Sequence, residues 1–307
     1  MNDGVKTIGV LTSGGDAPGM NAAVRAVVRT AIAYGCQVKG IQKGYSGLLE
    51  EEIIDLYAGS VSDIINRGGT FLYTARCEEF RTEEGQRKGA EICRKHGIDS
   101  VVVIGGDGSF QGARKLAACT DYTIGFDTAV NTAMEAIDKV RDTSTSHERC
   151  SIIEVMGRNA GYIALWCGIA NGAEDILLPE LYNYDEEALI DHIIANRSRG
   201  KKHHIIINAE GVGHSTSMAK RIEAATGIET RATILGHLQR GGSPTAKDRV
   251  MASVMGAYAV DALMGGKSNR VVAYKDGKYV DYDIEEALAM QKELDPFQYS
   301  VAKILAR

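Results

Sequence analysis

The stretch KTIGVLTSGGDAPGMN (residues 6–21) predicts a strand, a glycine turn and the start of a helix. Residues 8–11 are the apolar run that a buried parallel strand requires, and residues 21–33 have helical spacing without a breaker. Three glycines crowd the turn, although its spacing matches neither GxGxxG nor GxxxxGKS/T. Such a turn lets backbone N–H groups approach a phosphate at a helix amino terminus. The alternative is a tight turn that needs glycine only for its positive φ.

A second strand, glycine turn and helix occupy residues 100–118. The strand SVVVI ends in Gly105-Gly-Asp-Gly-Ser109, and two such turns predict a ligand that bridges the carboxyl ends of two parallel strands. Asp107 in this turn can hold Mg²⁺, directly or through water, beside a phosphate cradled by the backbone. As a purely structural feature, Asp107 would be the N-cap of the following helix.

Composition and charge narrow the class of protein. The 307 residues are enough for two α/β domains, and the apolar fraction of 44% and charged fraction of 24% are ordinary for a globular protein. A formal net charge of −5 argues against nucleic acid as a partner. The six cysteines form no CxxC pair, and neither a signal peptide nor a bilayer-length apolar run is evident. We therefore expect a reduced, cytoplasmic protein without a membrane partner.

Strands and helices alternate along the chain, which predicts an α/β fold of two doubly wound, Rossmann-like domains with mostly parallel sheets. Residues 44–47 (GYSG) are expected to form a loop, and residues 60–66 a short capped helix. Residues 275–278 (KDGK) are expected to form a hairpin turn. The remaining expected strands are residues 37–41, 151–156, 174–178, 203–208, 230–235 and 270–274.

Several charged residues stand in loops or directly after predicted strands. Arg76 and Arg81 lie in a loop, and Arg158 follows a strand. His237 and Arg240 precede two glycines after another strand. Arginine forks match phosphate oxygens and stabilise charge in phosphoryl transfer, so the pattern favours a phosphate or sugar site. For each residue taken alone, the alternative is solvated surface charge or a structural histidine.

Three further residues each have two interpretations. Glu210 follows a strand and could accept hydrogen bonds from sugar hydroxyls, or could act only as a helix cap. Arg25 and Arg29 are one helical turn apart, so they form either surface charges or a basic patch for a second anion.

Together these motifs resemble the bacterial-type ATP-dependent 6-phosphofructokinases over nearly the whole chain. The motifs that carry the resemblance are GVLTSGGDAPGMN (9–21), NRGGT (66–70), IGGDGS (104–109), DYTIGF (121–126), EVMGR (154–158), ETRAT (229–233) and LGHLQRGGSP (235–244). The resemblance implies the phosphofructokinase fold and a homotetramer. It also implies an ATP-binding domain of residues 1–125 plus 239–289 and a fructose 6-phosphate domain of residues 126–238 plus 290–307.

The resemblance also implies roles for individual residues. The ATP site would comprise Gly15, Tyr45, Arg76, Cys77, Arg81, Gly106, Asp107, Gly108 and Ser109, with Asp107 serving Mg²⁺. Fructose 6-phosphate would be held by Met156, Gly157, Arg158, Glu210, His237 and Arg240, with Arg149 and Arg231 reaching in from a neighbouring subunit. The effector site, for ADP or phosphoenolpyruvate, would comprise Arg25, Arg29, Arg141, Glu174, Lys201 and Lys202.

The expected reaction transfers the γ-phosphoryl group of Mg-ATP to the 1-hydroxyl of fructose 6-phosphate, giving fructose 1,6-bisphosphate and ADP, the committed step of glycolysis. Arg76 and Arg158 would neutralise transition-state charge, aided by the Gly15 backbone. Gly108 leaves room for ADP, whereas pyrophosphate-dependent relatives carry an Asp there, so ATP is favoured over the alternative donor pyrophosphate. Ala58 stands where the family often has an effector-site arginine, so allosteric control is expected to be weakened or altered.

One family motif has no counterpart. The Pro-Gly-Thr-Ile-Asp-x-Asp turn, whose first Asp takes the proton from the sugar hydroxyl, is absent, because residues 114–118 (RKLAA) run straight into residues 119–126. General-base assistance is typically worth about 10²–10⁴ in rate. A true deletion would leave a catalytically silent nucleotide- and sugar-phosphate-binding subunit.

Loss of an interior strand should harm a parallel sheet, so we expect the natural polypeptide to carry the segment. An intact mass of 33.0 kDa would contradict that expectation. A third hypothesis is another kinase with a GGDG turn, acting on NAD or a lipid; the motifs at residues 154–158 and 235–244 argue against it.

Overall fold

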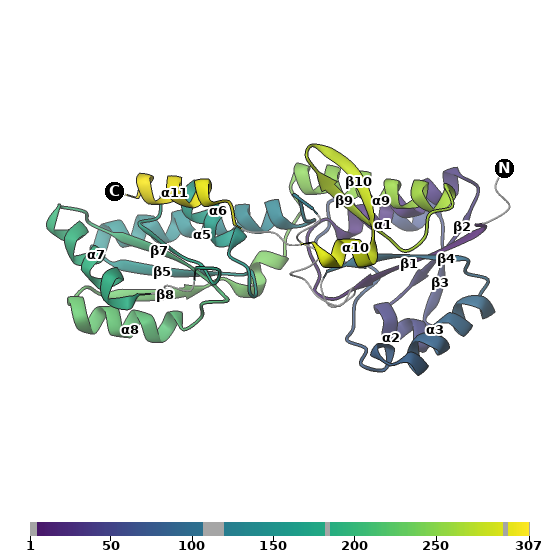
Figure 1. Ribbon diagram of the computed structural model, residues 1–307, viewed down its shortest axis with the longest axis horizontal. Coiled ribbons are helices and arrows are strands. Elements are labelled where there is room, and N and C mark those ends of the chain that lie inside the picture. Colours follow the sequence, from purple (N-terminus) through teal and green to yellow (C-terminus); the bar gives the residue numbers. More distant parts are fainter. Residues whose placement is uncertain (1–4, 107–119, 182–184, 291–293, 307) are drawn as a thin grey trace. The chain divides into compact units, whose positions relative to one another are not determined.

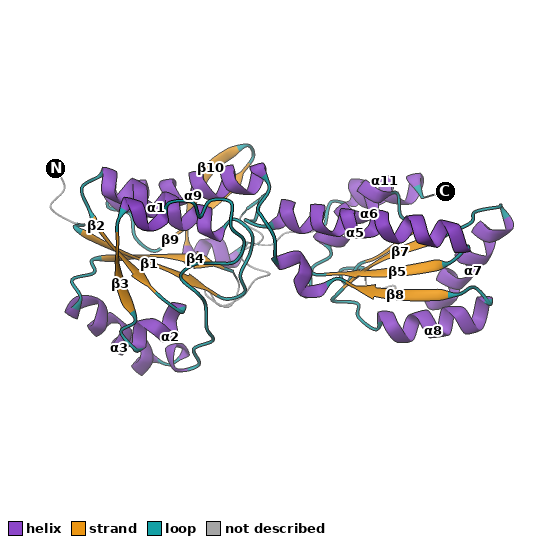
Figure 2. Ribbon diagram, turned by 180° about the vertical axis from the view of Figure 1, so that it is seen from behind, coloured by secondary structure: helices purple, strands orange, loops and turns teal. Residues whose placement is uncertain are grey.

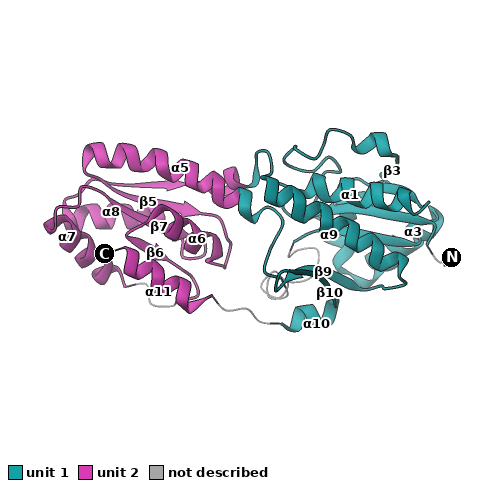
Figure 3. Ribbon diagram, turned by 90° about the horizontal axis from the view of Figure 1, so that it is seen from above, with its two compact units in different colours: residues 1–128, 240–292 teal, residues 129–239, 293–307 magenta. Residues whose placement is uncertain are grey.

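The computed structural model describes residues 5–106, 120–181, 185–290 and 294–306. The chain divides into two compact units, each built from two segments (Figure 3). Unit 1 comprises Met1–Thr128 and Arg240–Lys292, and unit 2 comprises Ala129–Gln239 and Glu293–Arg307. In both units a mostly parallel sheet is covered by helices, which confirms the predicted α/β class (Figures 1 and 2).

The sheet of unit 1 has the strand order β3-β2-β1-β4. Its centre, β1 (Thr7–Ser13), is buried along its whole length between the parallel strands β2 (Gln37–Ile41) and β4 (Ser100–Gly105). The outer strand β3 (Ile53–Leu56) runs antiparallel to β2. Helices α1 (Met20–Ala33) and α9 (Ala246–Met264) cover one face, while α2 (Gly44–Leu49) and α3 (Glu83–Lys95) cover the other (Figure 1).

A hairpin completes unit 1. Strands β9 (Arg270–Lys275) and β10 (Lys278–Asp283) are antiparallel, and α10 (Ile284–Ala289) follows them. The two residues of the turn, Asp276 and Gly277, have φ of 50° and 77°, as a tight two-residue hairpin turn requires.

The sheet of unit 2 has the order β6-β7-β5-β8, and all four strands are parallel. They are β5 (Cys150–Val155), β6 (Asp175–Leu177), β7 (His204–Ala209) and β8 (Thr230–Ile234). The helices are α5 (Phe126–His147), α6 (Tyr162–Asn171), α7 (Glu186–Ser198), α8 (Ser215–Thr226) and α11 (Pro296–Leu305). Isoleucines of β5 and β7 pack with side chains of α7 and α8, so the sheet is buried on that face.

Two local predictions were wrong. Residues 44–47 form the helix α2 rather than a loop, because Gly47 brings the helix against the strand end: a Cβ there would lie 1.8 Å from the carbonyl oxygen of Gln42. Residues 60–66 do not form a helix. The short 3₁₀ turn η1 (Ala58–Val61) ends before Asp63, whose φ of 57° breaks the helical path. No helix among the described residues is long and apolar enough to cross a membrane.

Candidate phosphate and sugar sites

The glycine turn after β1 closes around an arginine. Gly14 has a φ of 84°, and Arg240 donates from Nη1 to the carbonyl oxygen of Asp16 at 3.1 Å. A Cβ on Gly15 would lie only 2.6 Å from the same Nη1, so glycine at position 15 is what admits the guanidinium. Arg240 therefore lies against the predicted phosphate turn, and both belong to unit 1.

Asn21 ties this turn to two other motifs. Its Nδ2 donates to the carbonyl oxygens of Arg67 at 3.1 Å and Gly68 at 3.2 Å, and its Oδ1 accepts from the N–H of Phe71 at 2.8 Å. A Cβ on Gly68 would lie 2.3 Å from the carbonyl oxygen of Gly242. The motifs at residues 9–21, 66–70 and 235–244, which are distant in sequence, thus meet at the first turn.

The other residues expected at the ATP site lie on nearby elements of unit 1. Tyr45 of α2 stacks on Phe80, with ring centroids 4.1 Å apart, and burial raises the pKa of the Tyr45 phenol. Phe80 belongs to the turn η2 (Glu79–Arg81), so the stack holds Arg81 near α2. Arg81 pairs with Glu78 at 3.0 Å in the solvent. Arg76 and Gly106 are exposed, Cys77 is half-buried, and Asp107, Gly108 and Ser109 lie outside the described residues.

A carboxylate clamp lies at the carboxyl end of β5 in unit 2. Oε2 of Glu210 accepts from the backbone N–H of Gly157 at 3.1 Å and of Arg158 at 2.9 Å. Arg158 has a φ of 53°, and a Cβ on Gly157 would lie 2.3 Å from the carbonyl oxygen of Ala160. Glu210 follows β7, which is the neighbour of β5, so three of the predicted sugar residues, Gly157, Arg158 and Glu210, meet where open α/β sheets place their ligands.

A buried glutamine, missed in the sequence, holds the same strand end. Gln239 is fully buried; its Oε1 accepts from the N–H of Met156 at 2.8 Å, and its Nε2 donates to the carbonyl oxygen of Ala129 at 3.0 Å. It lies on the turn η4 (Gly236–Arg240) together with the exposed His237. In the sequence, only its position between the candidate residues His237 and Arg240 pointed to Gln239.

Arg149 and Arg231, the pair expected to reach a neighbouring subunit, share one carboxylate. Arg149 Nε lies 2.6 Å from Glu229 Oε2, and Arg231 Nη2 lies 2.7 Å from Glu229 Oε1. The hydrogen bonds from Arg149, and then from Arg231, hold the pKa of Glu229 below its usual value. Both arginines stand at the amino ends of their strands, which is the opposite end of the sheet from Glu210.

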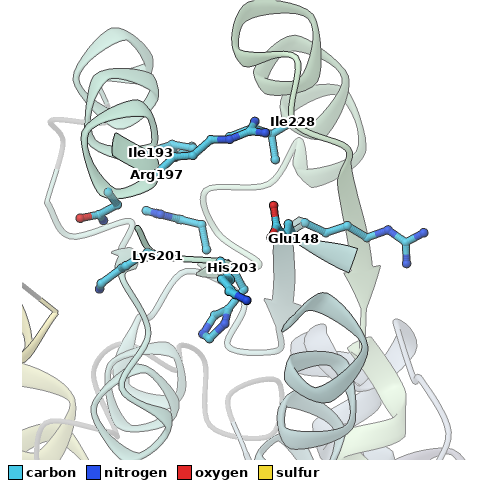
Figure 4. A pocket seen from close by; sticks show the side chains of 10 residues that line it. Glu148, Ile193, Arg197, Lys201, His203 and Ile228 are labelled. Carbon is cyan, nitrogen blue, oxygen red and sulfur yellow. The ribbon is translucent and has the colours of Figure 1, made fainter. Parts of the chain in front are cut away.

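The expected effector residues of unit 2 also come together. The buried carboxylate of Glu174 accepts from the N–H of Ile205 at 2.7 Å and from Lys201 Nζ at 3.3 Å. A pocket of about 310 Å³ is lined by Thr145, Glu174, Lys201, Lys202 and His203. Beside it lies a smaller, mostly basic pocket that shares Lys201, Lys202 and His203 (Figure 4).

Arg141 approaches the same pocket. Its Nη1 lies 3.1 Å from Nε2 of His203, and it also donates to the carbonyl oxygen of Asn171. Burial, with a smaller effect from the Arg141 charge, lowers the pKa of His203. Arg25 and Arg29 lie on α1 of unit 1, where Arg25 is half-buried and Arg29 is exposed.

Comparison with known proteins assigns the family. A family model described as "Phosphofructokinase" matches residues 7–119 and 117–263. The chain belongs to the phosphofructokinase family. An ATP-dependent 6-phosphofructokinase of Clostridium botulinum is 56% identical over 320 residues, covering 99% of this chain and all of that protein. The enzyme of the same name from Clostridium acetobutylicum is 57% identical with the same coverage.

Solved phosphofructokinase structures share the fold. The enzyme from Saccharomyces cerevisiae is 33% identical with a TM-score of 0.84, over 98% of this chain and 46% of that one. A pyrophosphate-dependent phosphofructokinase from Marinobacter aquaeolei has a TM-score of 0.82 at 23% identity, over 96% of this chain and 86% of that one, and this likeness concerns the fold alone.

The alignments also indicate a gap in this chain. The family model matches in two pieces that meet at residues 117–119, where the sequence predicted a missing segment. The alignment with the Clostridium botulinum relative spans 320 positions, and this chain has 307 residues, so at least 13 positions of that relative have no counterpart here.

Proposed function

We propose that this chain transfers the γ-phosphoryl group of ATP to the 1-hydroxyl of fructose 6-phosphate, giving fructose 1,6-bisphosphate and ADP. The full-length relatives at 56–57% identity are named for this ATP-dependent reaction. The structural observation that carries the proposal is the Glu210 clamp, which fixes the backbone of Gly157 and Arg158 at a strand end. A sugar phosphate lying there would meet the Arg158 cation.

The chemistry would rest on positioning and charge stabilisation rather than on covalent catalysis. Arg158 and Arg76 would neutralise charge on the transferred group, and the backbone N–H of Gly15 would aid them. Mg²⁺, which neutralises phosphate charge when bound, belongs to the proposal through Asp107, a residue outside the described part of the chain. The remaining proposed ATP contacts are Tyr45, Cys77, Arg81, Gly106, Gly108 and Ser109.

A second copy of the chain is part of the proposed sugar site. Arg149 precedes β5, and Met156 follows it. Six residues of strand span about 20 Å, so Arg149 and the clamp cannot hold the same small sugar phosphate within one chain. Arg149 and Arg231 would therefore serve a neighbouring subunit, which fits the proposed homotetramer.

Control by an anionic effector is a further part of the proposal. The pocket of about 310 Å³ with Lys201, Lys202 and His203 offers cations for a phosphate, and Arg141 lies beside His203. ADP or phosphoenolpyruvate would bind there, with Arg25 and Arg29 supplied by another copy. Ala58 removes one expected cation, so we expect weakened or altered control in a cytoplasmic enzyme.

The gap near residue 118 supports a second candidate function. If the missing positions include the proton-accepting Asp, the chain would bind ATP and fructose 6-phosphate and turn them over very slowly or not at all. The interruption of the family match at residues 117–119 is the observation that favours this candidate.

A coupled assay with ATP or pyrophosphate as donor separates these possibilities, on protein whose intact mass has been measured. We expect turnover with ATP and none with pyrophosphate. Calorimetric binding of both ligands without turnover would establish the silent subunit instead. Activity on NAD in place of fructose 6-phosphate would overturn both candidates.

A further inference from the structure

Two histidines and a carboxylate converge in unit 2, away from the proposed substrate site. Asp175 opens β6, His204 opens β7, and His192 lies on α7. Asp175 Oδ2 lies 3.0 Å from Nδ1 of His192 and 2.7 Å from Nε2 of His204. One ligand atom from each residue lies within 4.8 Å of the other two.

We propose that Asp175, His192 and His204 bind a divalent transition-metal ion of the zinc type. Two imidazoles and one carboxylate are a common donor set for zinc, which takes nitrogen and oxygen ligands at about 2.0–2.2 Å. Donor atoms around one tetrahedral ion then lie about 3.3 Å apart. The two separations that involve Asp175 are close to that value, so small side-chain movements would complete the site.

The contacts around the rings suit a change of tautomer. Nε2 of His192 lies 3.1 Å from Nδ2 of Asn196, and Oδ1 of Asn196 is buried with no partner among the described residues. An ion on Nδ1 of His192 would leave the ring proton on Nε2. A turn of the Asn196 amide by 180° would then let its unpartnered Oδ1 accept that proton, which is how an outer partner orients a metal-binding histidine.

Within the described residues, the ring of His204 has one hydrogen-bond partner, Asp175. Its side chain is 5% exposed, and its Nδ1 is buried without a partner in the described part of the chain. The ring is therefore held through Nε2, which points at Asp175. His192 and Asp175 are 33% and 23% exposed, which leaves a path for an ion and room for a water as fourth ligand.

The charged residues around the cluster determine how tightly we expect it to bind zinc. His204 and Asn196 also line the small pocket of Figure 4, whose Arg197, Lys201 and Lys202 disfavour a cation. Asp175 and the neighbouring Glu174 offset part of this repulsion. We therefore expect micromolar rather than tighter binding of zinc, and a faster loss of zinc than from a closed structural site.

The proposed metal site is independent of the proposed function. His204 begins β7, and Glu210 follows the end of the same strand, about 20 Å away. Metal binding can be measured without substrates, so its failure would leave the kinase proposal intact. Conversely, an inactive protein that binds zinc through these residues would support only the metal site.

Equilibrium dialysis of the full chain against Zn²⁺ tests the proposal. We expect one zinc per chain more in the wild type than in His192→Ala or His204→Gln, with His147→Ala, an exposed histidine outside the cluster, as the matched control. Zinc should also raise the melting temperature of the wild type and the control but not of His192→Ala. His192 is part-exposed, so its variant should fold even if His204→Gln does not.

Replacement of zinc by Co²⁺ provides a spectroscopic check. A four-coordinate cobalt site with two imidazoles gives visible absorption, which should appear in the wild type and vanish in His192→Ala. Equal zinc stoichiometry in the wild type and both variants would overturn the proposal. So would cobalt spectra that do not differ between the wild type and His192→Ala.

Discussion

The carboxyl ends of β4 and β5 differ in how completely they are held. In unit 2, β5 lies between β7 and β8, and Glu210 and Gln239 both fix the residues that follow it. In unit 1, β4 pairs with β1 alone among the described residues, and four of its six residues are only half-buried. The end of β5 is therefore fixed by two further side chains, whereas within the described residues β4 has a neighbouring strand on one side only.

In unit 1 a buried carboxylate anchors the segment that leads into α5. Asp248 is fully buried and accepts from the hydroxyl of Tyr122 at 2.5 Å and the N–H groups of Gly125 at 2.7 Å and Thr128 at 2.8 Å. The N–H of Asp121 also donates to the carbonyl oxygen of Tyr274 in β9 at 2.7 Å. Four substitutions or insertions test proton transfer, substrate binding and the stability of this segment one at a time.

The largest effect should come from restoring the missing turn. Insertion of the relatives' segment between Ala118 and Cys119 should raise kcat by about 10²–10⁴, because it would return a general base. The same insertion with Asn in place of the proton-accepting Asp is the control, and it should leave kcat at the starting value. Equal rates from both insertions would show that the segment acts by shape alone, which contradicts this account.

Removal of the clamp should act on binding. Glu210→Ala removes the acceptor of two backbone N–H groups, each bond to a charged partner being worth about 1.5–3 kcal/mol. The KM for fructose 6-phosphate should rise about 100-fold, while the KM for ATP changes less than about twofold. Glu223→Ala, on the exposed face of α8, should change neither. A fall in kcat with an unchanged KM would place Glu210 in the chemistry rather than in the clamp.

The sequence predicted the fold through its strongest local signals and failed where contacts between distant residues decide the structure. The alternation of strands and helices sufficed for the α/β class, since the strongest apolar runs, such as residues 8–11 and 100–104, are each followed by glycines. Gly44 and Gly47 wrongly indicated a loop, because glycine is common both in turns and where two backbones pack closely, and the sequence does not distinguish these two roles. Gln239, Asp248 and the Asp175 cluster were missed, because no spacing in the sequence shows which buried polar groups will meet.

The anchor of residues 120–128 should matter for stability. Asp248→Asn would point an amide at N–H donors that now reach a carboxylate, so the free energy of unfolding of unit 1 should fall by about 2 kcal/mol. Urea unfolding measures this loss. The control is Asp55→Asn, which removes only a surface ion pair with Lys39 and should cost less than about 1 kcal/mol. An equal loss in both variants would mean that residues 120–128 need no anchor.

The smallest effect concerns the hairpin that braces the same segment. Asp281 of β10 accepts from Lys267 and Arg270, and these hydrogen bonds, that of Lys267 first, lower its pKa to about 2. A carboxyl whose pKa is lower in the folded state stabilises the fold at pH values above its pKa in the unfolded chain, which is near 3.8. This contribution is lost as the pH falls through the folded-state pKa of about 2. The contribution is about 1–2 kcal/mol, because solvent screens the part-exposed partners.

Asp281→Asn should therefore lower the free energy of unfolding at pH 7 and flatten its fall between about pH 4 and pH 2, as acid titrations of urea unfolding would record. Asp55→Asn should leave the acid profile close to that of the wild type, since its ion pair is exposed. If the hairpin supports the edge of unit 1, Asp281→Asn should also deepen the loss caused by Asp248→Asn. If the losses in the free energy of unfolding of the two single variants simply add in the double variant, the hairpin does not support the anchor, because residues in one network couple and independent residues do not.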